Sequence, residues 1–278
     1  MSTDQRPLIV VVGHGTVSQD GIDQFLAVVS QLQTKVSVPV SHGFIESAYP
    51  DARSAISQSV ALYQPTDVVV LPLLLLPAGH VKNDVPAAVA AARTDFPTVR
   101  FTYARDLSVA EPLLSIIEER SHNPFDHLST PFNMTGAPDF TLLVGRGSSD
   151  RDANSDLYKI ARLLTERQTL GKVEPAFISL ALPSVPEALD NLKRLGATGI
   201  AIAPYFLFTG VLLDRIYSQA RKWHAGNPEI PLWLAREIGA DPRLVDLLAV
   251  RYSEAGLPLQ FRNCDTCVYR SEALGYRQ

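Results

Sequence analysis

Three residues that lie far apart in the sequence have side chains suited to binding a transition metal. They are His14 in the stretch GHGT, Glu46 in GFIES and His80 in LPAGH. Two imidazoles and a carboxylate suit a first-row divalent ion such as Fe, Co, Ni or Zn. Three ligands leave positions on the ion open, as a catalytic or transfer site requires. Considered one at a time, each of these residues could instead have a structural role, as a side chain that is hydrogen-bonded near the end of a strand.

The elements that position these residues are short apolar runs, each followed by a helical pattern. Uniformly apolar runs are typical of strands that are covered on both faces of a parallel sheet. The strand candidates are residues 8–12, 38–44, 68–71 and 99–103, and the helix candidates are residues 19–33, 52–63, 85–92 and 112–120. This alternation predicts an α/β fold with an open, mainly parallel sheet and helices on both faces.

The same order of blocks occurs twice along the chain. LIVVVGHGTVSQDGID corresponds to TLLVGRGSSDRDANSD, with Gly13 and Gly15 matching Gly145 and Gly147. GFIESAYPDARSAI and DVVVLPLLLLPAGH then match AFISLALPSVPEAL and GIAIAPYFLFTGV in the same order. The spacing between matching blocks is nearly constant at about 130 residues, so the chain contains two copies of one unit of about 125 residues.

The repeat predicts the domain organisation. We expect residues 1–125 to form the domain with the metal site and residues 139–256 to form a degenerate second copy. Residues 121–139 are rich in Pro, Ser, Thr and Asn and lack periodicity, which is typical of a linker, and we expect the linker itself at residues 126–138. Residues 257–278 have no counterpart in the first copy and form a tail.

The differences between the copies indicate where the function resides, since packing requirements are common to both. His14 corresponds to Arg146, and Glu46 corresponds to Ser179. His80 corresponds to Val211 when Gly79 is matched to Gly210. Ligands bind at the carboxyl ends of strands in open α/β sheets. We therefore expect the three residues of the first copy to converge on one site, whereas His42, His122, His127 and His224 lack this placement.

Composition excludes several classes of protein. The chain has 278 residues, a net charge of −4 and two cysteines, which argues against general nucleic-acid binding and against a disulfide framework. No segment has the pattern of a signal peptide or the length of a membrane span, so we expect a cytoplasmic protein. The GHGT turn is neither GxGxxG nor GxxxxGK[ST], which disfavours a nucleotide site, and no GxSxG elbow of a hydrolase is present.

The sequence resembles the sirohydrochlorin chelatases, which belong to the class II chelatases. The resemblance rests on VVGHGT at residues 11–16, GFIESAYPDA at residues 43–52 and LPLLLLPAGHVKNDVP at residues 71–86. The duplicated chain, with PYFLFTGVLLDRI at residues 204–216, is similar to the two-domain form found in cobalamin biosynthesis. The resemblance covers nearly the whole chain.

The resemblance implies an enzyme that inserts a divalent metal into sirohydrochlorin without ATP. Cobalt is the first expectation, and iron for sirohaem synthesis or nickel is the alternative. His14 and His80 would be metal ligands and proton acceptors, with Glu46 assisting them. A carrier that holds the metal or the tetrapyrrole without turnover is the alternative outside the enzymes.

The substrate class implied by the family is an octacarboxylate, so the protein must supply local positive charge. The candidates near the predicted site are Lys82, Arg105, Arg146, Arg215 and Arg236. Arg146 is the foremost of them because a fixed cation there replaces a metal ligand of the first copy. We expect the second copy to contact substrate carboxylates and the first copy to perform the metal chemistry.

The tail contains a CxxC pair, Cys264 and Cys267. Two cysteines cannot complete a four-thiolate site within one chain. Four interpretations of this pair remain. It could bind an Fe–S cluster shared across a dimer, store metal, form a redox disulfide, or have no role. The oligomeric state is also open. The duplication is compatible with a monomer, and pairing of the tails of two chains is compatible with a dimer.

Overall fold

The computed structural model describes residues 6–128 and 138–255, without the side chain of His80. The chain divides into two compact units. Unit 1 contains the described residues up to 108 together with those from 240 onward, and unit 2 contains residues 109–239. Each unit is built on its own β-sheet, which confirms the predicted α/β fold with mainly parallel sheets. Among the described helices, none is long and apolar enough to cross a membrane.

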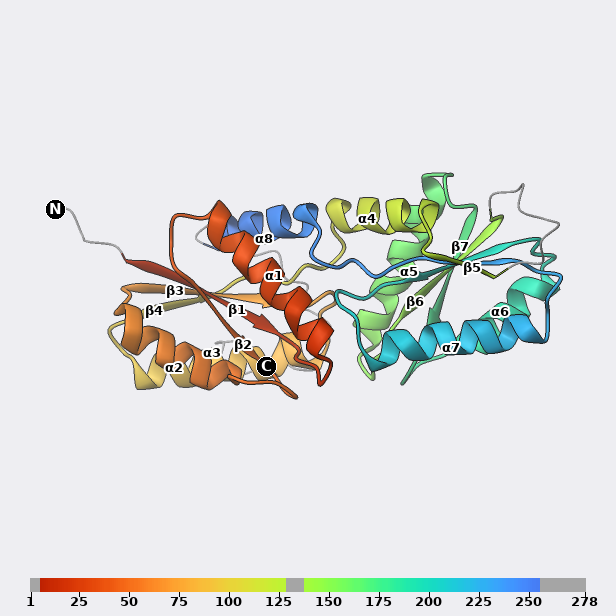
Figure 1. Cartoon of the computed structure of the whole chain (residues 1–278). Coiled ribbons are helices and arrows are strands. Elements are labelled where there is room, and N and C mark those ends of the chain that lie inside the picture. The colour runs from red at the N-terminus through yellow and green to blue at the C-terminus, as the bar shows by residue number, and fades with distance from the viewer. Residues whose placement is uncertain (1–5, 129–137, 256–278) are drawn as a thin grey trace. The chain divides into compact units, whose positions relative to one another are not determined.

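Unit 1 is a parallel four-stranded sheet in the order β2-β1-β3-β4. Helices α2 and α3 cover one face of the sheet, and α1 and α8 cover the other (Figure 1). The elements are β1 Pro7–Gly13, α1 Gln19–Lys35, β2 Val40–Phe44, α2 Ala52–Tyr63, β3 Asp67–Leu73, the π-helical turn η1 His80–Asp84, α3 Val85–Asp95, β4 Arg100–Tyr103 and α8 Pro242–Glu254.

Unit 2 repeats this order and adds one strand, giving β5-β9-β8-β6-β7. Strand β5 pairs antiparallel to β9, within the segment whose composition predicts a linker, and the other pairs are parallel. The elements are α4 Glu111–His122, β5 Asp126–Leu128, β6 Phe140–Gly145, α5 Arg151–Glu166, β7 Lys172–Phe177, α6 Val185–Arg194, β8 Ile200–Pro204, α7 Val211–Ala225 and β9 Leu232–Leu234. Helices α4 and α5 lie on one face, and α6 and α7 lie on the other (Figure 1).

The compact units regroup the two sequence repeats through their last helices. Helix α4 ends the first repeat in sequence but belongs to unit 2, where it contacts β8 and α5. Helix α8 ends the second repeat but belongs to unit 1, where it contacts α1 and β3. Leu244, Val245 and Leu248 on one side of α8 are buried. Each sheet is therefore covered on one face by the helix that ends the other repeat.

The apolar strands form the centre of each unit. Residues 8–12 in β1 have no exposed surface, because helices cover both faces of the sheet. Leu142, Leu143 and Val144 in β6, the corresponding strand of unit 2, are equally buried. This double burial explains why the sequence of these strands lacks the alternation of polar and apolar residues that marks a half-exposed strand.

A glycine turn at the carboxyl end of the first strand brings two loops together in each unit. Gly15 has φ +92°, and a Cβ there would lie 1.8 Å from the carbonyl oxygen of Glu46. Gly147 has φ +84°, and its Cβ would lie 1.9 Å from the carbonyl oxygen of Ser179. Both positions therefore require glycine, for its left-handed backbone and for the close approach of the next loop.

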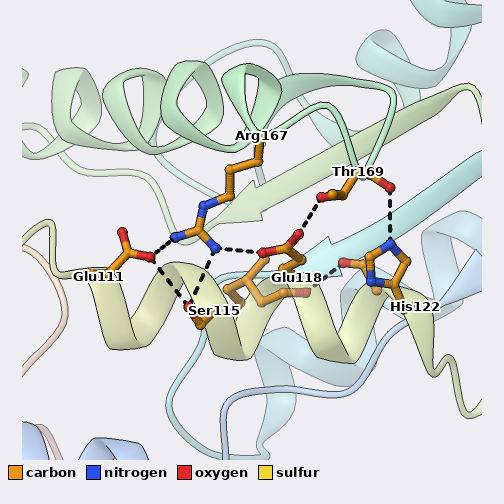
Figure 2. Close-up of polar contacts among 8 residues, drawn as sticks. Glu111, Ser115, Glu118, His122, Arg167 and Thr169 are labelled. Carbon is orange, nitrogen blue, oxygen red and sulfur yellow. Dashed lines mark hydrogen bonds and ion pairs between the residues drawn. The ribbon is translucent and has the colours of Figure 1, made fainter.

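A polar network holds α4 against the end of α5 in unit 2 (Figure 2). Arg167 pairs with Glu111 and, at 2.6 Å, with Glu118. The Thr169 hydroxyl donates to Glu118, and His122 Nε2 lies 3.0 Å from the Thr169 carbonyl oxygen. The hydrogen bond from Thr169, followed by that from Arg167, holds the pKa of Glu118 below its ordinary value.

The glycine turn predicts a specific cost for adding one methyl group. We expect Gly15→Ala to lower the free energy of unfolding more than Gly196→Ala does, as measured by urea denaturation. Gly196 has φ +86° and nothing within 4 Å of its Cβ position, so its substitution reports backbone strain alone, about 1–2 kcal/mol. Equal losses in the two variants would show that the approach of Glu46 adds no constraint at Gly15.

The network in unit 2 predicts a pH-dependent loss of stability. Glu118→Gln should lower the free energy of unfolding by about 1–3 kcal/mol at neutral pH, because a carboxylate with charged and hydroxyl donors is lost. A carboxyl whose folded pKa is lowered stabilises the protein above its ordinary pKa, and this contribution disappears as the pH falls through the folded value. The deficit of the variant should therefore shrink as urea denaturation is repeated down to about pH 3.

The matched control is Glu166→Gln, which removes the carboxylate that pairs with Arg162 on α5. The side chain of Glu166 is 56% exposed, whereas that of Glu118 is 22% exposed. An exposed pair contributes about 0–1 kcal/mol, so the control should differ little from the parent. A pH-independent deficit for Glu118→Gln would contradict a stabilising role for its charge.

Candidate functional site

The structure places His14 directly after β1, with its ring beside Glu46. The Nε2 atom of His14 lies 3.6 Å from Oε1 of Glu46, and the side chains are 31% and 50% exposed. The Nδ1 atom lies 3.2 Å from the carbonyl oxygen of Gly15. A carbonyl oxygen only accepts hydrogen bonds, so the proton in this contact resides on Nδ1. When the ring is neutral with this proton in place, its lone pair lies on Nε2, the nitrogen that faces Glu46 and that can bind a metal.

Two backbone hydrogen bonds fix the loop of Glu46 against the turn of His14. The amide of Ile45 donates to the Gly13 carbonyl at 2.9 Å, and the amide of Glu46 donates to the His14 carbonyl at 3.0 Å. Strands β1 and β2 are neighbours, so their carboxyl ends emerge side by side. Parallel pairing therefore brings together an imidazole and a carboxylate that are far apart in the sequence, on the edge of the sheet where ligands bind.

His80 opens the π-helical turn η1 at the start of the helix that follows β3. Its backbone is described, but its side chain lies outside the described part of the structure. Within the side chains that are described, no group of three or more His, Cys, Asp or Glu residues is arranged to hold a metal ion. The described structure thus supplies the pair His14 and Glu46. Cys264 and Cys267 also lie outside the described residues.

Unit 2 retains the backbone of this arrangement with different side chains. The amide of Ile178 donates to the Gly145 carbonyl at 3.0 Å, and the amide of Ser179 donates to the Arg146 carbonyl at 2.9 Å. Arg146 is exposed at the end of β6, where unit 1 has His14. Val211, at the position of His80, opens the regular helix α7. Unit 2 therefore presents a cation and a hydroxyl where unit 1 presents an imidazole and a carboxylate.

The other basic candidates lie on two different units. Lys82 in η1 and Arg105 after β4 belong to unit 1, and both are partly exposed. Arg215 in the first turns of α7 is exposed on unit 2. The guanidinium carbon of Arg236, also in unit 2, lies 5.0 Å from the centre of the Phe125 ring, which is cation–π geometry.

The remaining histidine near this edge has a structural environment. The ring of His42 in β2 packs edge-on against Phe25 and Phe44, with 5.9 Å between ring centres in each pair. Burial lowers the pKa of His42, which favours the neutral form. The π-helical form of the turn that His80 opens was not predicted from the sequence, although Pro86 could have indicated an irregular helix there.

Comparisons with known proteins show which family the chain is similar to. The CbiX family profile matches residues 8–123 and again residues 141–255. A sirohydrochlorin cobaltochelatase of Priestia megaterium is 38% identical over 263 residues, covering 94% of this chain and 84% of the relative. A sirohydrochlorin ferrochelatase of Bacillus subtilis (strain 168) is 29% identical over 250 residues, covering 90% of this chain and 92% of the relative.

Solved structures give the same result. SirB from Bacillus subtilis with Fe³⁺ superposes with a TM-score of 0.76 at 29% identity, covering 90% of this chain and 96% of that one. The sirohydrochlorin chelatase SirB from Bacillus subtilis subspecies spizizenii, in complex with cobalt, superposes with a TM-score of 0.75 at 26% identity, covering 90% and 95%. The family profile matches both repeats and together covers most of the chain. The protein therefore belongs to the CbiX family.

Proposed function

We propose that this protein is a chelatase that inserts a divalent metal into sirohydrochlorin, with cobalt as the first choice. The observation that carries the proposal is the pairing of His14 Nε2 with Glu46, 3.6 Å apart, at the carboxyl ends of neighbouring parallel strands. Support comes from relatives named as sirohydrochlorin chelatases and from the presence of this pair in only one of two otherwise similar units.

Insertion exchanges one divalent ion for two protons on pyrrole nitrogens of the macrocycle. A neutral imidazole holds a first-row ion through one nitrogen lone pair and has an ordinary pKa of about 6.5, so it can also take a proton near neutral pH. In our proposal His14 binds the incoming ion through Nε2 while its Nδ1–H donates to the Gly15 carbonyl. Glu46 adds negative charge that attracts the cation and carries a released proton toward solvent, to which half of its side chain is exposed.

We assign His80 as the third ligand from its place in the sequence. It opens the turn that follows β3, and β3 pairs with β1 on the side opposite β2. The three strand ends that carry His14, Glu46 and His80 are thus contiguous in the sheet of unit 1. A ligand set of this kind accepts several first-row ions, so cellular supply contributes to the choice of metal.

The carboxylates of the substrate require cationic partners, and we propose Arg146, Lys82, Arg105 and Arg215 for this role. Arg146 is the strongest of the four because it stands on the unit 2 backbone that corresponds to the His14 turn. A planar guanidinium binds a carboxylate through two parallel hydrogen bonds. Unit 2 would accordingly bind the periphery of the substrate, while unit 1 performs the exchange of metal for protons.

A ferrochelatase is the second candidate function. The observations that favour it are the ferrochelatase relative of Bacillus subtilis and the SirB structure with Fe³⁺. The same three residues would act on either ion, and the reaction differs only in the metal that is delivered.

The pair Cys264 and Cys267 adds a proposal about cofactors. Two thiolates per chain satisfy half of an Fe–S site, so a cluster would have to be shared between two chains. Such a cluster gives visible absorption in anaerobically purified protein that iron chelation removes. Protein without this absorption would leave a redox disulfide, a metal store or no function for the pair.

The site assignment predicts a large loss of activity in two variants. His14→Ala should lower kcat/KM for Co²⁺ insertion by about 100-fold or more, because one residue serves as ligand and proton acceptor. Glu46→Gln should lower it by about tenfold or more, because the charge is lost while the shape remains. The assay follows the absorption bands of sirohydrochlorin over several turnovers with Co²⁺, Fe²⁺ and Ni²⁺ in turn.

His127→Ala is the control, since this exposed histidine in β5 contacts the Trp233 ring and has no place in the proposed site. It should insert metal as fast as the parent. Parental activity in His14→Ala would overturn the site assignment, and binding without turnover in the parent would favour a carrier. A higher kcat/KM for Fe²⁺ than for Co²⁺ would select the ferrochelatase.

The carboxylate proposal predicts a separate effect on substrate binding. Arg146→Ala should raise KM for sirohydrochlorin about fivefold, equivalent to about 1 kcal/mol for an exposed ion pair, with kcat unchanged. Arg162→Ala removes a cation whose side chain is 75% exposed on α5, away from the strand ends, and should leave KM unchanged. An unaltered KM in Arg146→Ala would show that this residue does not bind the substrate.

A further inference from the structure

The turn that His80 opens is π-helical because of a proline. The helical segment from His80 to Asp95 contains Pro86 in its interior. In an α-helix, the proline ring collides with the carbonyl four residues earlier, which here is that of Lys82. Widening the preceding turn to the π-helical pattern moves this carbonyl away.

The π-helical turn leaves the backbone carbonyl of Val81 without a hydrogen-bond donor from the helix itself. In the π-helical pattern each carbonyl accepts from the amide five residues further on. For Val81 that residue is Pro86, which has no N–H. A carbonyl without a hydrogen-bond partner inside a protein is destabilising, so another donor is required.

Tyr103 supplies that donor from the end of β4. Its hydroxyl donates to the Val81 carbonyl at 2.9 Å, and this hydrogen bond is buried. Tyr103 is 6% exposed, and the side chain of Val81 is also 6% exposed, in the core of unit 1. On the other side of His80, the Lys82 amide donates to the Ala78 carbonyl at 3.0 Å. The backbone on both sides of His80 is therefore held in place.

Unit 2 lacks this arrangement. Tyr217 stands at the position of Pro86, and α7 runs as a regular helix from Val211 to Ala225. Leu234 stands at the position of Tyr103. The Tyr217 hydroxyl donates to the Ala235 carbonyl at 2.8 Å, so a buried tyrosine bonds to a buried carbonyl here as well, but it contacts no π-helical turn. Within residues 6–128 and 138–255, the proline, the wide turn and its tyrosine occur together in the unit that carries His80 and not in the other.

We propose that Tyr103 is a positioning residue that holds the π-helical turn and thereby places His80 at the carboxyl edge of the unit 1 sheet. This inference rests on the proposed function, in which His80 is a metal ligand. Groups that orient a metal ligand without touching the ion affect metal affinity or activity by about 10–100-fold. The hydroxyl of Tyr103 acts through the Val81 carbonyl, one residue from the ligand.

The test compares Tyr103→Phe with Tyr217→Phe in the full chain. Each variant loses one buried hydroxyl bonded to a backbone carbonyl, so both should show similar losses in thermal stability. Tyr103→Phe should raise KM for Co²⁺ about tenfold and leave KM for sirohydrochlorin unchanged. Tyr217→Phe should leave both constants at the parental values. An unchanged KM for Co²⁺ in Tyr103→Phe, or an equal rise in both variants, would overturn the inference.

A second measurement separates this inference from the proposed function. Hydrogen exchange of peptides that cover residues 80–86 should be faster in Tyr103→Phe than in the parent and unchanged in Tyr217→Phe. Unchanged exchange in Tyr103→Phe would refute the inference even if the parent inserts metal and His14→Ala does not. If the parent inserts no metal, the proposed function fails, whereas hydrogen exchange still decides whether Tyr103 holds the turn.

Discussion

The candidate site depends on one close contact between backbones, the approach of Gly15 to the carbonyl oxygen of Glu46. No side chain fits between them, since a Cβ at Gly15 would lie 1.8 Å from that oxygen. The contact allows the loop after β2 to bond to the turn after β1 through consecutive amides. The placement of His14 beside Glu46 is thus a consequence of parallel pairing and a glycine turn, before either side chain contributes any interaction of its own.

A site built on backbone contacts can be copied without its chemistry, and unit 2 is such a copy. Gly147 makes the same approach to Ser179, and the same two amides donate to the same two carbonyls, although Arg146 replaces the histidine. The side chains at these strand ends are partly exposed and contribute little to packing. They can therefore change from ligands to a cation while the strands and turns that carry them remain. The features that both units share are therefore those that the fold requires, and the side chains that differ are those that the proposed reaction requires.

The sequence predicted the features that depend on local pattern or on strand order. The apolar runs identified the buried parallel strands, and strand order then brought His14 and Glu46 to one edge. Other features depend on contacts that no local pattern contains. The periodicity of α8 indicates a helix but not the sheet that it covers, and the short strand β5 forms only because β9 is available to pair with it. The hydrogen bond from Tyr103 to the turn of Pro86 is likewise a tertiary contact.

Helices α4 and α8 each cover the sheet of the other repeat, and this affects the order in which the two units can fold during synthesis. Unit 1 consists of two separate stretches, and its helix α8 spans Pro242–Glu254, whereas unit 2 is continuous from residue 109 to 239. A ribosome therefore finishes all of unit 2 before it makes the helix that covers one face of the unit 1 sheet. Domains generally fold as units during synthesis, with N-terminal ones first. Here unit 1 is completed after unit 2 although its strands are made first, and a nascent polypeptide carries His14 and Glu46 on a sheet that lacks one of its covering helices until α8 has been made.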